Sequence, residues 1–215
     1  MKLAILCDFD GTIVDLDTAE FLLNKFAEGN WEIFDLQLER GEITLKECMQ
    51  KQFSMLKAPK DVMLKELEAV ANFRPNFEKF VKYCETHGFP FIIVSAGLDF
   101  AIKYFLKLKG WANLIRVHAA KTRFLEDGIE FDFPKLWDIT SIDFKEDLVK
   151  HFKTQGYKVV YIGDGISDYT AVRRANFSFV IKDSNLANLC KKEEILYHEI
   201  TDFQEVINSI NDYIF

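Results

Sequence analysis

Two carboxylates, Asp8 and Asp10, stand one residue apart, directly after the apolar run 3–7 and directly before a Gly-Thr pair. An apolar run of this kind predicts a buried parallel strand, and ligands of open α/β sheets bind beyond the carboxyl ends of such strands. Side chains alternate along a strand, so both carboxylates share one face if the extended backbone continues through Phe9. Two like charges this close are costly unless a cation lies between them or one of them holds a proton. The pair therefore predicts catalysis or metal binding at this point of the chain.

Polar side chains end two further apolar runs in the same way. Ser95 closes the run 89–94, and Asp164 closes the run 159–163, with Asp168 four residues further on. Taken alone, a serine here is typical of a strand or helix cap, and an Asp-x-Asp pair is typical of a solvated strand end. If the three strands are parallel, however, their carboxyl ends meet at one edge of the sheet. We therefore expect these side chains to share one crevice.

The remaining pattern predicts the elements that position these groups. Apolar runs rich in Val and Ile alternate with helical patterns, which favours an α/β fold with a doubly wound, Rossmann-like parallel sheet and right-handed crossovers. Asp99 is predicted to cap the helix after the second strand, and Asp202 is predicted to cap the C-terminal helix. Residues 122–142 predict a β excursion with a hairpin turn at Glu126-Asp127-Gly128. Strands are expected at 3–7, 89–95, 114–120, 159–164 and 177–181.

A long helical insertion separates the first two predicted strands. Residues 15–72 have helical patterns throughout, whereas a usual connection between elements has about 4–6 residues. We therefore expect a core domain made of residues 1–13 and 74–215, with an inserted α-helical cap subdomain at residues 14–73.

Length, charge and cysteine content narrow the possible partners. At 215 residues, with 49% hydrophobic and 28% charged residues, the chain suits one globular domain plus an insertion. A formal net charge of -7 disfavours nucleic-acid binding, which relies on lysine and arginine to neutralise phosphates. No apolar run approaches the ~18 residues of a membrane span, and the four cysteines form no CxxC pair. We expect a cytoplasmic protein with a small-molecule partner, no nucleic acid and no membrane association.

Taken together, the ordered motifs resemble those of the haloacid dehalogenase (HAD) superfamily of phosphohydrolases. The first motif, DxDGT, stands at residues 8–12, the second at Ser95 and the fourth at residues 163–168. The third motif is a lone lysine, best matched by Lys145, which lies nineteen residues before Asp164. The insertion after the first motif is similar to the cap of the subfamily that includes phosphoserine phosphatase.

The resemblance implies a division of roles among the carboxylates. Asp8 is expected to be the nucleophile that forms an aspartyl-phosphate. Asp10 is expected to protonate the leaving oxygen and then to take a proton from the attacking water. The expected cofactor is Mg²⁺, held by the carboxylates of Asp8 and Asp164 and by the main-chain carbonyl of Asp10.

The resemblance also implies a phosphate site. The Ser95 hydroxyl, the Ala96 amide and the Lys145 ammonium group are expected to bind phosphate oxygens. Asp168 is expected to steady Lys145 or a metal-bound water without touching the metal itself.

Other interpretations fit part of the same pattern. Lys150 and Lys121 compete with Lys145 for the third motif, because nearly all lysines are solvated surface charges. A two-component receiver domain also combines acidic groups with Ser/Thr and Lys, but its phosphoacceptor Asp lies on the third strand and it has no cap. A phosphomutase and a phosphate-binding regulatory protein without turnover stay open. Asp10 favours phosphate esters, since dehalogenases have no alkoxide to protonate.

The expected cap should decide which ester is bound, because it closes over the leaving group. Phosphoserine phosphatases use a cap Glu and a cap Arg, and the corresponding positions here hold Asp17 and Gln52. Glutamine lacks the charged fork that recognises a carboxylate. Residues 12–75 also carry twelve acidic against eight basic residues, which is unfavourable for capturing an amino-acid carboxylate.

A second resemblance is to the methionine-salvage phosphatases that act on 2-hydroxy-3-keto-5-methylthiopentenyl phosphate. Residues 95–100 are similar to their Ser-Gly-Gly-Met-Asp-Phe stretch, and residues 131–134 are similar to their Asp-Trp-Pro. Ala96 departs from the pattern, because it replaces a glycine that lets the backbone approach phosphate. The resemblance implies kinship within the subfamily and makes this ester a candidate substrate.

Overall fold

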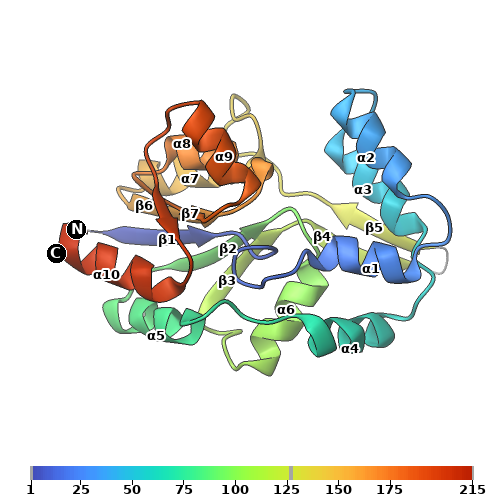
Figure 1. Cartoon of the computed structure of the whole chain (residues 1–215), viewed down its shortest axis with the longest axis horizontal. Coiled ribbons are helices and arrows are strands. Elements are labelled where there is room, and N and C mark those ends of the chain that lie inside the picture. The colour runs from blue at the N-terminus through green and yellow to red at the C-terminus, as the bar shows by residue number, and fades with distance from the viewer. Residues whose placement is uncertain (1, 126–127, 215) are drawn as a thin grey trace.

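A six-stranded parallel sheet organises the computed structural model, which describes residues 2–125 and 128–214 (Figure 1). The strand order is β3-β2-β1-β6-β7-β8, and every neighbouring pair is parallel. The order reverses at β1, which pairs with β2 on one side and with β6 on the other. The predicted α/β class with a parallel sheet is confirmed. The strands are β1 (Leu3–Cys7), β2 (Phe91–Ser95), β3 (Ile115–Ala119), β6 (Lys158–Gly163), β7 (Phe177–Ile181) and β8 (His198–Ile200).

β1 is apolar throughout because both faces of the sheet are covered. Leu3, Ile5 and Cys7 pack into the hydrophobic core on one face. Ala4 and Leu6 pack into the core on the other face. All five side chains are buried, so the strand has no solvent-facing side that would carry polar residues.

Helices cover the two faces of the sheet separately (Figure 1). α5, α6 and α10 supply side chains to the core that contains Ile5, and α7, α8 and α9 supply side chains to the core that contains Leu6. Among the described residues, no helix is long and apolar enough to cross a membrane. The bounds are α5 (Phe77–His87), α6 (Asp99–Leu108), α7 (Phe144–Thr154), α8 (Tyr169–Arg174), α9 (Asn185–Lys192) and α10 (Phe203–Ile214), with a short 3₁₀ helix, η1 (Ile166–Asp168), before α8.

Five of the described helices lie between β1 and β2 in sequence, and the first four of them precede α5 within the predicted insertion. The side chain of Asp17 caps α1 by accepting a hydrogen bond from the backbone N–H of Glu20, and Thr44 and Glu47 form a reciprocal capping box at the start of α3. In Figure 1, α2 and α3 stand away from the sheet, beyond α1. The division into a core and a cap at residues 14–73 stays a prediction. The bounds are α1 (Thr18–Phe26), α2 (Glu32–Glu39), α3 (Leu45–Ser54) and α4 (Lys60–Val70).

A two-stranded antiparallel hairpin follows β3. Its strands are β4 (Lys121–Leu125) and β5 (Gly128–Asp132), within the region where the β excursion is predicted. Residues 126–127 of the predicted turn lie outside the described residues. The hairpin packs against α3, so it connects the sheet to the inserted helices.

Two polar side chains hold the hairpin in place. The Gln50 side chain pairs with the β5 backbone like a neighbouring strand, since Nε2 donates to the Ile129 carbonyl at 2.7 Å and Oε1 accepts from the Phe131 N–H at 3.3 Å. The prediction that Asp99 caps α6 is wrong, because Leu98 occupies the N-cap position. The Asp99 carboxylate instead accepts from the backbone N–H of Thr122 at 2.9 Å, because the start of the hairpin lies beside it.

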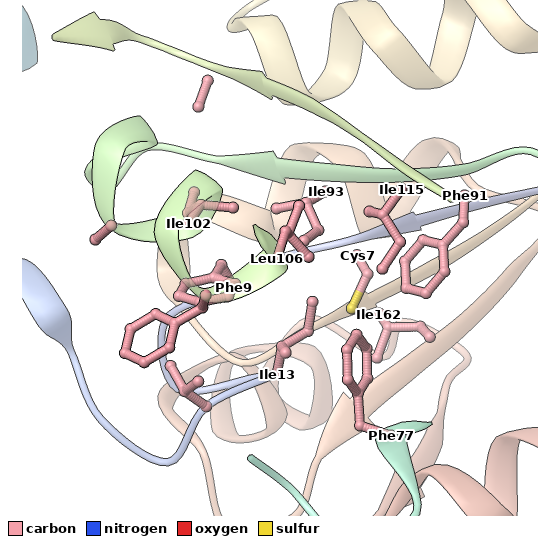
Figure 2. Close-up of a cluster of buried hydrophobic side chains, with 14 of the residues drawn as sticks. Cys7, Phe9, Ile13, Phe77, Phe91, Ile93, Ile102, Leu106, Ile115 and Ile162 are labelled. Carbon is pink, nitrogen blue, oxygen red and sulfur yellow. The ribbon is translucent and has the colours of Figure 1, made fainter. Parts of the chain in front are cut away.

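Phe77 anchors α5 to the sheet, and its removal should be costly. Figure 2 shows its ring pointing toward Cys7 and Ile162, and it is 1% exposed. We expect Phe77→Ala to lower the free energy of unfolding by about 3–5 kcal/mol, because truncation leaves a cavity among packed rings. Lys79→Ala on the exposed face of α5 is the matched control and should change it by less than about 0.5 kcal/mol. Urea unfolding followed by circular dichroism measures both, and equal losses would contradict the packing described.

Candidate active site

The carboxyl ends of β1, β2 and β6 deliver polar groups to one pocket of about 540 Å³. Asp8 follows β1, Ser95 ends β2 and Asp164 follows β6, at the point where the strand order reverses. Residues of α1, α2 and α3 form the opposite wall. The sheet side of the pocket is lined by Asp8, Asp10, Ser95, Ala96, Gly97, Asp164, Gly165 and Ser167.

Lys145 lies beneath the pocket with its ammonium group fully hydrogen-bonded. Nζ donates to Asp8 Oδ2 at 2.7 Å, to Asp168 Oδ1 at 2.6 Å and to Ser167 Oγ at 3.0 Å, which uses its three N–H groups. The side chain is 2% exposed. Burial alone would lower the pKa of Lys145, but the carboxylates of Asp168 and Asp8 raise it above its ordinary value. The ammonium group therefore stays charged.

The two other lysines considered for the third motif lie elsewhere. Lys150 faces Asp138, with Nζ 3.5 Å from Oδ2, and donates to Ser141 Oγ at 3.2 Å. Lys121 is exposed at the start of β4. Of the three, Lys145 has its ammonium group against the Asp8 carboxylate.

Asp168 is saturated with hydrogen bonds. Oδ1 accepts from Lys145 Nζ and from the Tyr161 hydroxyl, both at 2.6 Å. Oδ2 accepts from the backbone N–H groups of Asp164 and Gly165, both at 3.1 Å. These four bonds occupy the ~4 lone-pair sites that a carboxylate offers, so Asp168 has none left for a metal. Its position suits the predicted role of steadying Lys145.

Asp10 lies between the pocket and the first inserted helix. Its Oδ1 accepts from the backbone N–H of Thr18 at 2.9 Å. Burial and, to a smaller extent, the negative charge of Asp17 raise the pKa of Asp10 to about 7. A Cβ atom at Gly97 would lie 2.2 Å from Asp10 Oδ2, so the carboxylate occupies space that only a glycine leaves open.

Hydrogen bonds from the Arg74 side chain hold the loop after β1. Sequence analysis did not single out Arg74. Arg74 Nε donates to the Thr12 carbonyl at 2.7 Å and Nη2 donates to the Gly11 carbonyl at 2.5 Å. The Thr12 hydroxyl in turn donates to Asp164 Oδ1 at 2.6 Å. Gly11 has a φ of +69°, and a Cβ atom there would lie 2.2 Å from Asp164 Oδ2. The DxDGT loop thus packs directly against the carboxylate that follows β6.

Ser95 and Ala96 lie on the sheet side of the pocket. Ser95 is 0% exposed as a residue, and its Oγ accepts from the backbone N–H of Gly97 at 2.9 Å. The Ser95 proton has no acceptor among the described residues, so it is free for a ligand. Ala96 lines the same pocket.

The two residues predicted to set specificity also line the pocket. Asp17 stands at the start of α1, and Gln52 lies on α3 with 5% exposure. Gln52 Nε2 donates to Asp35 Oδ1 at 2.8 Å and to the Trp31 carbonyl at 3.5 Å. Sequence analysis did not single out Asp35, because no local pattern distinguishes it from the other acidic residues of the helices.

The family comparison agrees with this geometry. Residues 5–173 match the family model described as haloacid dehalogenase-like hydrolase. The chain belongs to the haloacid dehalogenase-like hydrolase family. The matched range includes every predicted motif of this HAD hydrolase, from Asp8 to Asp168. The resemblance to the superfamily, and with it the prediction of a hydrolytic enzyme, is confirmed.

Two of the similar curated proteins are named 2-hydroxy-3-keto-5-methylthiopentenyl-1-phosphate phosphatase. The protein of Geobacillus thermodenitrificans is 28% identical over 215 residues, which cover 97% of this chain and 96% of the relative. The protein of Brevibacillus brevis is 28% identical over 96% of this chain and 94% of the relative.

Solved structures share the fold of this HAD hydrolase at low sequence identity. A phosphoserine phosphatase with a phospho-aspartyl intermediate analogue has a TM-score of 0.68 and 19% identity, over 96% of this chain and 97% of that chain. A HAD family hydrolase from Salmonella enterica serovar Typhi has a TM-score of 0.76 and 16% identity, over 98% of this chain and 72% of that chain. These matches support the fold.

A cluster of three carboxylates in the HAD hydrolase offers the oxygen ligands that suit a divalent cation. Oxygen atoms of Asp8, Asp164 and Asp168 lie within 4.8 Å of one another. Because Asp168 is saturated, Asp8 and Asp164 are the two with capacity for an ion. Burial raises the pKa of Asp164 to about 6, and burial together with the Asp168 charge raises the pKa of Asp8 well above its ordinary value. A cation would relieve this repulsion.

The raised pKa of Asp164 predicts a pH-dependent stability of the metal-free protein. A carboxyl group with a raised pKa stabilises the fold below the unfolded-state pKa, and this contribution is lost as the pH rises through about 6. Asp164→Asn removes the charge, so at pH 8 the metal-free variant should be more stable than the wild type by about 1–3 kcal/mol. At pH 4 the two should be nearly equal.

Thermal unfolding with and without Mg²⁺ checks this prediction. Millimolar Mg²⁺ should raise the Tm of the wild type and leave that of Asp164→Asn unchanged. Asp61→Asn, which changes an exposed carboxylate on α4, is the matched control and should follow the wild type. An equal Mg²⁺ effect on the wild type and Asp164→Asn would show that Asp164 is not a ligand.

Proposed function

We propose that this HAD hydrolase is a Mg²⁺-dependent phosphatase that cleaves a small phosphate monoester through an aspartyl-phosphate on Asp8. The observation that carries the proposal is the position of the Asp8 carboxylate. It lies 2.7 Å from the Lys145 ammonium group and within 4.8 Å of the Asp164 carboxylate, at the floor of a pocket. An anionic nucleophile beside fixed positive charge suits phosphoryl transfer, which depends on positioning and charge neutralisation.

Asp8 acts as the nucleophile in this proposal. An oxygen of its carboxylate attacks phosphorus, and the bond between phosphorus and the leaving oxygen breaks. Water then attacks the aspartyl-phosphate, which releases phosphate and restores the carboxylate. Asp8, Asp164 and the Asp10 main-chain carbonyl would hold Mg²⁺, which supplies positive charge to the phosphate oxygens.

Asp10 acts as the acid and the base. A pKa of about 7 lets its carboxyl group hold a proton near neutral pH and donate it to the leaving oxygen. The resulting carboxylate then takes a proton from the attacking water. The hydrogen bond from Thr18 holds Oδ1, so Oδ2 is the oxygen that transfers the proton.

The phosphate site combines Ser95, Ala96 and Lys145. The free proton of the Ser95 hydroxyl and the Ala96 N–H would donate to phosphate oxygens. All three N–H groups of Lys145 have protein partners, and the longest of these bonds goes to the neutral Ser167 hydroxyl. A phosphate oxygen would replace Ser167 as the third acceptor.

The candidate substrate is the ester in the relatives' name, 2-hydroxy-3-keto-5-methylthiopentenyl-1-phosphate. The pocket supports it, because Leu23, Met49 and Phe53 give the wall of α1 and α3 an apolar part that suits a thioether. Phosphoserine is the second candidate, from the likeness to phosphoserine phosphatases. The four cysteines are free and buried, which suits a reducing compartment, and we place the enzyme in the cytoplasm.

Hydrolysis of p-nitrophenyl phosphate by wild type and Asp8→Asn tests the proposal. The wild type should release phosphate with Mg²⁺ and lose this activity with EDTA, and Asp8→Asn should be at least about 10³-fold slower because it lacks the nucleophile. Acid-quenched wild type should carry covalent phosphate. A protein without turnover whose Asp8→Asn variant behaves identically would favour the regulatory interpretation, and a bisphosphate product would indicate a mutase.

Asp10→Asn tests the acid role through the leaving group. For an alkyl phosphate we expect kcat/KM to fall by about 10²–10⁴, because the alkoxide needs a proton as the bond breaks. For p-nitrophenyl phosphate, whose leaving group is stable as an anion, the fall should be less than about tenfold. Steady-state kinetics on the two esters measure the difference. Equal losses would exclude proton donation by Asp10.

A further inference from the structure

The wall of the pocket opposite the catalytic carboxylates presents carboxylates and a hydrogen-bond acceptor. We infer that this wall selects phosphate esters whose leaving group carries hydroxyl or ammonium donors and no negative charge. The inference rests on the proposed phosphatase function and adds the chemistry of the substrate's far end to it. It adds Asp35 to the residues predicted to set specificity, Asp17 and Gln52, and gives the Gln52 amide a stated role.

The charged side chains of this wall are all acidic. Asp17, Glu20, Glu32 and Asp35 line the pocket, and none of them forms an ion pair with another described residue. No lysine or arginine is among the described residues that line the pocket. A leaving group with a carboxylate or a second phosphate would therefore meet unbalanced like charge.

The neighbours of Gln52 determine which end of its side-chain amide, the nitrogen or the oxygen, faces them. Its amide lies against Asp35 Oδ1 at 2.8 Å and the Trp31 carbonyl at 3.5 Å. Both partners are acceptors, so the atom that faces them has to be the NH₂ nitrogen, whose two protons they use. Oε1 then has no hydrogen-bond partner among the described residues, and it is not one of the fully buried atoms, although Gln52 as a residue is 5% exposed at the pocket wall. A ligand donor would satisfy it.

Asp35 is held in place by the same contacts. Its Oδ1 accepts from Gln52 Nε2 and lies 3.6 Å from the Cys48 thiol, which donates to it. Asp35 is half-buried and lines the pocket, so its charge acts in a less polar setting than that of an exposed carboxylate. A hydroxyl or ammonium group at the far end of the substrate therefore meets a fixed carboxylate beside a fixed amide oxygen.

A length-matched series of esters tests the inference. The probes are 3-aminopropyl phosphate, 3-hydroxypropyl phosphate, n-butyl phosphate and the phosphate ester of 3-hydroxypropanoate, which ends in a carboxylate. We expect kcat/KM to be higher for the amine and the alcohol than for butyl phosphate, and about ten- to a hundredfold higher for the amine than for the carboxylate. The kcat/KM of the amine compared with that of the alcohol distinguishes selection of a charged donor from selection of a neutral donor.

Variants locate the selection in the wall. Asp35→Asn keeps an acceptor for Gln52 but loses the charge, so the ratio of amine to carboxylate should fall by about three- to tenfold. Glu32→Gln, at an exposed position of the same wall, should also lower the ratio of amine to carboxylate. Asp61→Asn, on α4 outside the pocket, is the matched control and should leave the ratio unchanged.

Hydrolysis of p-nitrophenyl phosphate separates this inference from the proposed function. If that ester is cleaved but the carboxylate probe is cleaved as fast as the amine, the selection is wrong and the phosphatase proposal stands. A ratio unchanged in both Asp35→Asn and Glu32→Gln would likewise overturn the role of the wall. If p-nitrophenyl phosphate and all four probes are inert with Mg²⁺, the phosphatase proposal itself fails.

Discussion

The buried ammonium group of Lys145 is the interaction on which the site depends. It joins the end of β1, through Asp8, to η1, through Asp168, and it comes from a third element, α7. Removing these charges from water is expensive, and the attraction between them compensates only when the geometry is good and the remaining polar atoms are satisfied. That condition holds for Asp168, whose other bonds go to Tyr161 and the backbone. The Lys145 ammonium group fixes Oδ2 of Asp8. One positive charge does not balance the three carboxylates of Asp8, Asp164 and Asp168, so the site can accept a further cation.

Much of the fold and part of the site could be predicted because they depend on local patterns. An apolar run buried on both faces, followed by Asp8 and Asp10, indicates a central parallel strand and its functional end regardless of the rest of the chain. Sequence analysis missed β8, because its three residues are too few to show an apolar periodicity. Sequence analysis also missed α9. The interpretation of Asp99 as a cap failed because a tertiary contact with Thr122 competes for the carboxylate. Arg74 lies 62 residues from Thr12 in sequence, and no local signal connects the two.

Close approach between side chains and backbone limits which residues the loops of the candidate active site accept. The side chain of Asp10 occupies the space where a Cβ at Gly97 would lie, and Asp164 does the same at Gly11. The loop after β1 thus meets the loops after β2 and β6 through carboxylates, and these carboxylates have raised pKa values because burial disfavours their charge. The protein keeps groups together that destabilise its metal-free fold, and this is the arrangement expected where function outweighs local stability.

The pocket wall that we propose to select the leaving group is tied to the proposed catalytic groups by two separate contacts. On α3, Gln50 pairs with the β5 backbone while Gln52, two residues further on and therefore on another side of the helix, lies at the pocket. The hairpin that holds Gln50 is itself anchored to α6 through Asp99. At the other end of the insertion, Thr18 of α1 donates to Asp10. A movement of the inserted helices would therefore change both the pocket wall at Gln52 and the hydrogen bond to Asp10. In the proposed mechanism, recognition of the far end of the substrate and protonation of the leaving oxygen then depend on the same packing.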